Sequence, residues 1–179
     1  MLIIDNFSSL FVIFYYVGET FKRFKGGCSN YTFHAKSPPV TWERSRQLCK
    51  NTGLGDLVSI ESYAEWIFLK NITLELKMAD QYFIGLRRDE RDRPWKWLSN
   101  KSTSQNDLPW AENEPNGDGN CVTMYKDYRQ DYGKYNDLDC TLQPRPGYIC
   151  EFPVDGCNRK GNSSTFHTYF KTIVLNIFL

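Results

Sequence analysis

Two short segments of the chain concentrate side chains that could bind a metal ion. Residues 112–121 read ENEPNGDGNC, and residues 135–140 read YNDLDC. The candidate ligand atoms are the carboxylate and carboxamide oxygens of Glu114, Asn116, Asp118, Asn136 and Asp137. Such oxygens are ligands of hard cations, and Ca²⁺ binds about six to eight of them. A cis bond before Pro115 would turn the side chains on either side of it toward one point. The two segments therefore predict a calcium site.

Two other interpretations of these residues are open. The first is a polar loop with a turn proline, because a motif as short as Glu-Pro-Asn often occurs by chance. The second treats Glu112 and Glu114 as the carboxylate pair of a glycosidase. That pair lies only two residues apart on a loop, and the sequence shows no set of nucleophile, base and orienting residue. We therefore predict that the protein is not an enzyme.

Composition restricts the class of protein. The 179 residues suffice for one domain with a hydrophobic core, plus tails. The 22 basic and 21 acidic residues are nearly balanced and form no long block of one sign. A dedicated nucleic-acid-binding protein would show a basic stripe, so we expect no nucleic-acid partner.

Cysteine usage indicates the compartment. The chain has 6 cysteines and only 2 histidines, and no two cysteines have the close spacing of a zinc site. An even, well-spread set favours disulfide bonds in an oxidising compartment. Sequons for N-glycosylation begin at Asn6, Asn30, Asn71, Asn100 and Asn162. We therefore predict an extracellular glycoprotein, either secreted or at the cell surface.

Two helices are expected early in the chain. Thr41 is the predicted N-cap of a helix over 42–51 that places Trp42, Ser45 and Cys49 on one face. The second helix lies within 62–72, where Ser62 and Glu65 form a capping box. Its apolar face is predicted from three residues at helical spacing, Ala64, Phe68 and Ile72.

Strands are expected on both sides of these helices. Apolar alternation or continuous apolar runs predict them within 28–35, 53–60, 81–88, 94–100, 121–126 and 146–152. Residues 100–120 form a long polar, glycine-rich loop. Long loops inside compact domains usually carry function, and this one contains the first candidate metal segment.

Three regions divide the chain. The compact domain is expected at residues 28–157, and residues 158–179 form a C-terminal tail. Residues 1–27 form an N-terminal segment with an apolar run from Leu10 to Val17. This run lacks a basic flank and follows Asp5. A signal peptide or membrane anchor on one side, and an inaccurate start of the chain on the other, both remain open.

The order of these segments resembles the C-type lectin-like domain over about residues 28–151. The resemblance rests on WERSRQLC, GDLVSIES, FIGL, WKW, WAENEPN, YNDLDC and GYICE, which occur in the family's order. It implies an α+β fold with two helices, small antiparallel sheets and a long calcium-binding loop, stapled by disulfides. It also implies the pairs Cys49–Cys150 and Cys121–Cys140, which leaves Cys28 and Cys157 as the remaining pair.

The resemblance also implies a function. Glu114, Asn116, Asn136 and Asp137 match residues that hold Ca²⁺ in the family and contact two neighbouring sugar hydroxyls. A Glu-Pro-Asn motif goes with mannose, N-acetylglucosamine and fucose. The expected partners are therefore mannose-type glycans on glycoproteins or microbial surfaces. The alternative is a domain that binds a protein ligand through the face of its long loop, without sugar. Whether the chain forms a homo-oligomer is open.

The sequence departs from the family pattern at the loop. Gly119 stands where a glutamate is usual, so either Asp118 supplies the missing carboxylate or the site has one ligand fewer. Tyr135 replaces the usual tryptophan. An auxiliary calcium site is incomplete, because Arg88 and Gly117 occupy its acidic positions and Asp92 alone would not hold an ion.

Overall fold

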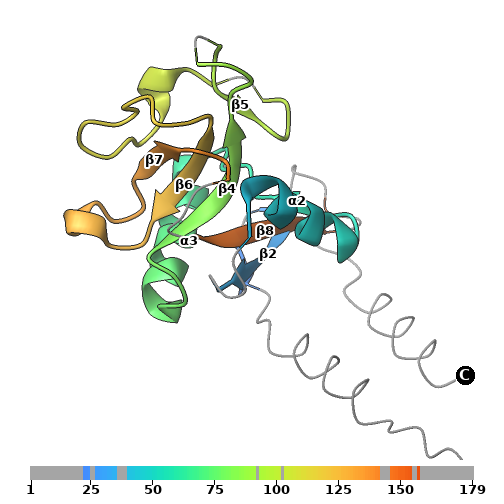
Figure 1. Ribbon diagram of the computed structural model, residues 1–179. Helices are drawn as coiled ribbons and strands as arrows, with labels where there is room; N and C mark the ends of the chain where they lie inside the picture. The colour runs from blue at the N-terminus through green and yellow to red at the C-terminus, as the bar shows by residue number, and fades with distance from the viewer. Residues whose placement is uncertain are drawn as a thin grey trace, which may run out of the picture.

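The computed structural model describes residues 22–24, 27–35, 40–91, 93–101, 103–141, 146–154 and 157. Figure 1 labels most of its elements and colours them from blue to red in chain order. They are β1 (Lys22–Arg23), β2 (Ser29–His34), α2 (Trp42–Asn51), β3 (Asp56–Leu57), α3 (Tyr63–Leu76), β4 (Gln81–Arg87), β5 (Lys96–Trp97), η1 (Gln105–Asp107), β6 (Cys121–Tyr125), η2 (Tyr128–Gln130), β7 (Tyr135–Leu138) and β8 (Gly147–Pro153). The predicted α+β class with two helices is confirmed for the described residues.

The strands join into one mixed sheet. Its order is β1-β2-β8-β4-β6-β7, with β3 added to β8 and β5 added to β4, eight strands in all among the described residues. Every pairing is antiparallel except that of β4 with β8. This parallel contact is short, Tyr82 opposite Gly147 and Phe83 opposite Tyr148. The separate small antiparallel sheets that we expected are thus connected by two residue pairs at the centre of the domain.

Strand β4 is buried on both faces and carries the core. Tyr82, Ile84 and Leu86 pack into one hydrophobic cluster, and Phe83 packs into a second cluster on the opposite face. Gly85 gives the backbone of β3 room to approach, because a Cβ there would lie 2.6 Å from the Leu57 carbonyl oxygen. The apolar run in the sequence is therefore a central strand of the sheet, between β8 and β6.

Helix α2 matches its prediction. The Thr41 side chain accepts a hydrogen bond from the backbone N–H of Arg44 at 3.1 Å. Trp42, Ser45 and Cys49 are all buried, and the indole N–H of Trp42 donates to the carbonyl of Ile84 at 2.8 Å. This bond ties the start of the helix to β4.

Helix α3 begins as predicted but presents a different face. Ser62 caps the backbone N–H of Glu65 at 3.2 Å. The face buried in the domain is Glu65, Leu69 and Thr73, whereas Ala64 is exposed and Phe68 and Ile72 lie beside that face, half-buried. The Glu65 carboxylate turns inward because it accepts from the Tyr31 hydroxyl at 2.7 Å and from the N–H of Glu61 at 2.8 Å. Phe68 and Ile72 do pack against the core cluster, but the most buried face is displaced by one residue from the predicted one.

Two strands were not anticipated. β7 contains the second candidate metal segment and pairs with β6, placing Asn136 opposite Thr123 and Asp137 opposite Val122. β1 lies within the expected N-terminal segment and pairs with β2, so the sheet begins at Lys22. The apolar run 10–17 and the tail 158–179 lie outside the described residues. Among those described, neither helix has the length and apolar character needed to span a bilayer.

All three predicted disulfides are confirmed. Cys28 pairs with Cys157, Cys49 with Cys150 and Cys121 with Cys140. Cys49 and Cys150 are buried in the second core cluster and join α2 to β8. The Cys121–Cys140 bond closes the hairpin of β6 and β7 next to the candidate site.

Removing the Cys49–Cys150 bond should destabilise the domain most. The bond joins residues 101 positions apart, for which chain entropy alone gives up to about 4.7 kcal/mol. We expect Cys49→Ala with Cys150→Ala to lower the free energy of unfolding in urea by about 4 kcal/mol. The chain-entropy cost is similar for the Cys28–Cys157 bond, whose residues lie 129 positions apart. Cys28→Ala with Cys157→Ala should still cost less overall, because these two cysteines are only half-buried, whereas Cys49 and Cys150 are buried in the core. An equal or larger loss in the second variant would contradict this ranking.

Candidate functional site

The long loop is fixed to β7 at Tyr135, the first residue of the second candidate segment. The backbone N–H of Ala111 donates to the carbonyl of Tyr135 at 2.9 Å, and the N–H of Tyr135 donates to the carbonyl of Pro109 at 2.8 Å. Trp110 and Tyr135 form a parallel bridge at the same point. In Figure 1 the loop lies above the strands, at the end of the sheet away from α3. This docking brings residues 114–118 beside Asn136 and Asp137.

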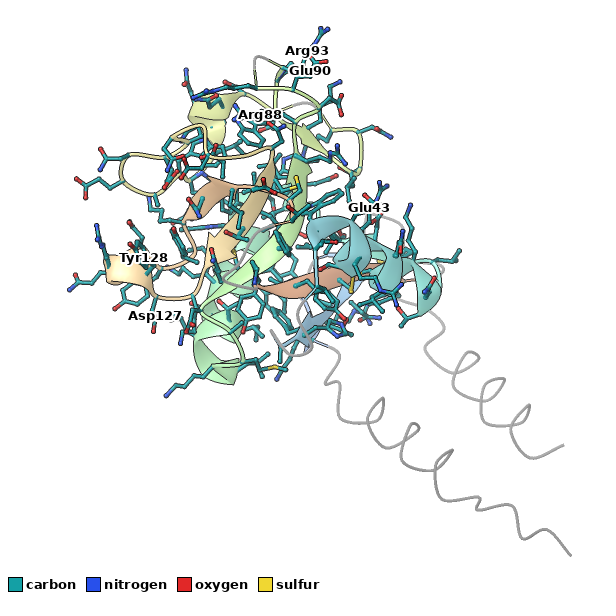
Figure 2. All side chains as sticks on the ribbon, in the orientation of Figure 1. Glu43, Arg88, Glu90, Arg93, Asp127 and Tyr128 are labelled. Carbon is teal, nitrogen blue, oxygen red and sulfur yellow. A yellow bond between two sulfur atoms is a disulfide. The ribbon has the colours of Figure 1, made fainter. Side chains whose placement is uncertain are left out.

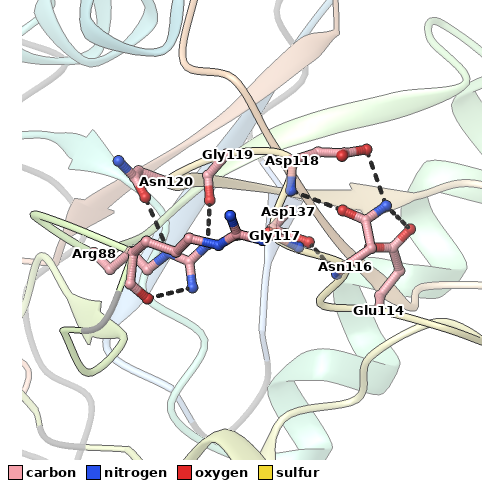
Figure 3. A network of polar contacts seen from close by, with 9 residues as sticks. Arg88, Glu114, Asn116, Gly117, Asp118, Gly119, Asn120 and Asp137 are labelled. Carbon is pink, nitrogen blue, oxygen red and sulfur yellow. Dashed lines mark hydrogen bonds and ion pairs between the residues drawn. The ribbon is translucent and has the colours of Figure 1, made fainter.

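The predicted ligands form one polar network, shown in Figure 3. The Asn116 side-chain N–H₂ donates to Asp118 Oδ2 at 2.9 Å and to Glu114 Oε1 at 3.3 Å. The backbone N–H of Asn116 donates to Asp137 Oδ1 at 2.9 Å, and that of Gly117 donates to Asp137 Oδ2 at 3.0 Å. The Glu114–Pro115 bond is cis. The structure therefore places Glu114, Asn116, Asp118 and Asp137 together.

Asn136 completes the group through its side-chain amide, whose two orientations have the same shape. With its nitrogen toward Glu114, it donates to Oε1 at 2.8 Å and Oε2 at 3.2 Å, and its oxygen accepts from the Tyr125 hydroxyl at 3.2 Å. With its oxygen toward Glu114, the amide and the carboxylate present oxygens to each other. A cation between the two oxygens would satisfy that second arrangement, and so would a proton on Glu114.

Asp137 has an environment that the sequence did not reveal. It belongs to a polar segment, yet only 1% of it is exposed. Its two oxygens hold the loop backbone at Asn116 and Gly117, and its Oδ2 also lies 3.4 Å from the guanidinium of Arg88. Asp137 therefore supports the loop as well as belonging to the site.

Arg88 and Tyr125 are site residues that we did not predict as such. Arg88 was noted only as a replacement at an auxiliary calcium site, and Asp92 of that site lies outside the described residues. The signal for Arg88 is its place directly after the buried strand β4. Nothing in the sequence distinguishes Tyr125, which lies at the end of β6 and reaches Asn136 across the hairpin.

Close packing at Gly119 gives a physical reason why this position carries no glutamate. A Cβ at this position would lie 1.9 Å from the carbonyl carbon and oxygen of Leu138, so no side chain fits unless the backbone moves. The short loop packs directly against β7 here. The position that carries a carboxylate in the resembled family is thus used for close packing in this chain.

Electrostatic conditions at the site favour a cation. Burial, followed by contact with the carboxylate of Asp137 and the charge of Asp118, raises the pKa of Glu114 to about 7. Burial and the charge of Glu114 likewise raise the pKa of Tyr125 to about 12. Negative charge is therefore crowded around Glu114, and a bound cation would relieve it.

The donor set fits a calcium ion better than a transition metal. Within the described residues, no three His, Cys, Asp or Glu side chains gather closely enough to hold a metal by themselves. An ion here would need the amide oxygens of Asn116 and Asn136 beside the carboxylates. A set made only of oxygens, with amides among them, is typical of calcium and not of zinc.

Comparisons with known proteins agree with this fold. The family model for the lectin C-type domain matches residues 38–152. L-selectin from Mus musculus is 34% identical over 140 residues, which are 75% of this chain and 36% of that protein. The chain spans between about a quarter and a third of the selectins that it matches.

Two solved structures are also similar. The SPL-1–GlcNAc complex has a TM-score of 0.61 and 26% identity, over 74% of this chain and 91% of that one. The cow carbohydrate-recognition domain of CD23, in the presence of a GlcNAc2Man3 oligosaccharide, has a TM-score of 0.57 and 26% identity, over 75% and 98%.

The family match covers most of the domain, including both site segments. It supports the prediction that the protein is not an enzyme, because lectin domains bind their ligands without transforming them. The chain belongs to the C-type lectin domain family.

Proposed function

We propose that this domain binds glycans outside the cell through a calcium ion held by Glu114, Asn116, Asn136 and Asp137. The observation that carries the proposal is that these four residues lie together, although they come from two segments about twenty residues apart in the sequence. Asp118 is the proposed fifth ligand, since it lies against Asn116 and adds negative charge near Glu114. The similarity to carbohydrate-recognition domains supports the sugar as ligand.

The protein residues have two roles in this proposal. A bound calcium ion supplies open coordination positions for two neighbouring sugar hydroxyls. The Glu114 carboxylate accepts a hydrogen bond from a sugar hydroxyl, and the amide groups of Asn116 and Asn136 donate N–H to hydroxyl oxygens. The same side chains therefore hold the cation and test the direction of each hydroxyl. A Glu-Pro-Asn sequence supports mannose, N-acetylglucosamine or fucose as the terminal sugar.

Removing single ligands tests the site. Glu114→Ala and Asn116→Ala should each weaken calcium-dependent retention on immobilised mannose at least about 100-fold, because each removes a ligand oxygen. Both residues lie on the surface loop, so circular dichroism should remain that of the wild type. Glu112→Ala is the matched control, since Glu112 is exposed and lies outside the network. Undiminished retention by both variants would rule out the calcium mechanism.

Exchanging the two loop ligands tests specificity. Glu114→Gln combined with Asn116→Asp exchanges which hydroxyl meets a donor and which meets an acceptor. We expect the preference to move from mannose toward galactose by about tenfold in relative affinity, a change of about 1.4 kcal/mol. Competition by free monosaccharides on a glycan surface measures this ratio. A wild type that already prefers galactose would show the assignment to be wrong.

Protons should compete with calcium at Glu114. Its pKa is raised to about 7 without metal, so protonation begins close to neutral pH, and calcium needs the ionised carboxylate. Below pH 7 the affinity for calcium should fall by up to about tenfold per pH unit. Retention on mannose from about pH 8 to about pH 5, at two calcium concentrations, measures this loss.

The direction of the calcium effect separates this mechanism from unfolding. More calcium should move the loss of sugar binding to lower pH by mass action, while circular dichroism stays constant. A midpoint that ignores calcium, or binding that persists in chelator at neutral pH, would instead favour a domain that binds a protein ligand without calcium.

A further inference from the structure

Arg88 is a buried cation at the base of the candidate site. It follows β4 directly, and only 7% of it is exposed. Its guanidinium lies over the ring of Trp95, 4.5 Å from the ring centroid. The aromatic face removes one side of the cation from water, so its remaining N–H groups must find acceptors in the protein.

Two of these acceptors belong to the loop that carries the predicted ligands, and the third is the backbone of Arg91, shortly after β4. Nε donates to Asn120 Oδ1 at 3.0 Å, and one terminal nitrogen donates to the carbonyl of Gly119 at 2.7 Å. The other terminal nitrogen donates to the carbonyl of Arg91 at 2.9 Å. Figure 3 shows the planar fork lying beside residues 117–120. A single side chain thus fixes three separate points of backbone and loop.

The guanidinium of Arg88 also contacts Asp137, the carboxylate that holds the ligand loop. The nitrogen that bonds Gly119 lies 3.4 Å from Asp137 Oδ2. Asp137 in turn accepts the backbone N–H groups of Asn116 and Gly117. The contacts form one chain from Arg88 through Asp137 to Asn116, and the buried positive charge balances a buried negative one.

We propose that Arg88 is the positioning residue of this site: its guanidinium holds loop residues 116–120 in their binding geometry without a metal ion. The loop is therefore ordered before calcium binds. The part of this inference that concerns calcium rests on the proposed function, whereas the part that concerns loop order does not.

Lysine cannot replace arginine in this role. An ammonium group is a single point of charge and cannot reach Gly119, Asn120 and Arg91 at once, whereas the planar fork can. A role in charge balance alone would survive Arg88→Lys and be lost in Arg88→Gln. A positioning role is lost in both variants.

Amide hydrogen exchange in EDTA tests loop order directly. The reporters are the backbone N–H groups of Asn116 and Gly117, and the amides of β6 report global folding. We expect both reporters to be protected in the wild type without calcium. In Arg88→Lys and Arg88→Gln they should exchange roughly 10- to 100-fold faster while β6 is unchanged. Calcium affinity measured by calorimetry should fall in both variants.

Arg93→Gln is the matched control for lost charge. Arg93 is exposed, lies 3.9 Å from Glu90 and projects from the tip above Arg88 (Figure 2). It should leave exchange and calcium binding unchanged. If neither Arg88 variant folds, Asn120→Ala removes only the acceptor of Nε and should give a smaller loss of protection at the same two amides.

Three results would overturn the proposal. They are a wild-type loop protected only when calcium is added, full protection retained in Arg88→Lys, and unchanged exchange in Asn120→Ala. A wild type that binds no calcium would instead refute the proposed function, and the comparison in EDTA would still decide whether Arg88 holds the loop.

Discussion

The candidate site depends on the buried carboxylate of Asp137. Its position on β7 is set by pairing with β6, and the Cys121–Cys140 bond closes the same hairpin. From there it accepts the backbone N–H groups of Asn116 and Gly117, which bend the loop back onto the sheet. A carboxylate almost fully removed from water must be paired, and the loop amides and Arg88 are those pairs. The shape of the loop is thus a consequence of satisfying one buried charge.

Features with a local physical signature could be predicted from the sequence. Thr41 and Ser62 cap their helices because a short hydroxyl side chain before a helix satisfies a free N–H. The short apolar run of β4 favours a strand buried on both faces, and the structure has one there. The two segments of the site were found because hard-cation ligands concentrate there in a pattern that resembles a known family. The disulfide pairs came from the same resemblance, since spacing alone does not specify connectivity.

Features that depend on distant partners could not be predicted. The apolar periodicity of α3 gave no sign that Glu65 is buried, because a hydrogen bond from the distant Tyr31 draws it inward. The polar segment around Asp137 likewise gave no sign that this carboxylate is buried. Strand β7 was not predicted, because its polar residues Asn136 and Asp137 give no alternation of polar and apolar side chains. Its pairing with β6 is what makes it a strand. Arg88 could be seen as unusual, but its partners on residues 119 and 120 are known only from the fold.

The loop of this chain has fewer carboxylates than the resembled pattern and is held by contacts with Arg88 and Asp137. In the pattern that this chain resembles, position 119 carries a glutamate and position 88 an acidic residue. Here Gly119 packs against the backbone of Leu138, and Arg88 donates to the carbonyl of Gly119. The neighbourhood of the site therefore loses carboxylates and gains a cation, and calcium affinity depends on the charge of the ligand set. A loop already held by Arg88 and Asp137 spends less conformational entropy when an ion binds. The two effects oppose each other. The preformed loop therefore compensates for part of the calcium affinity that is lost with the missing carboxylates.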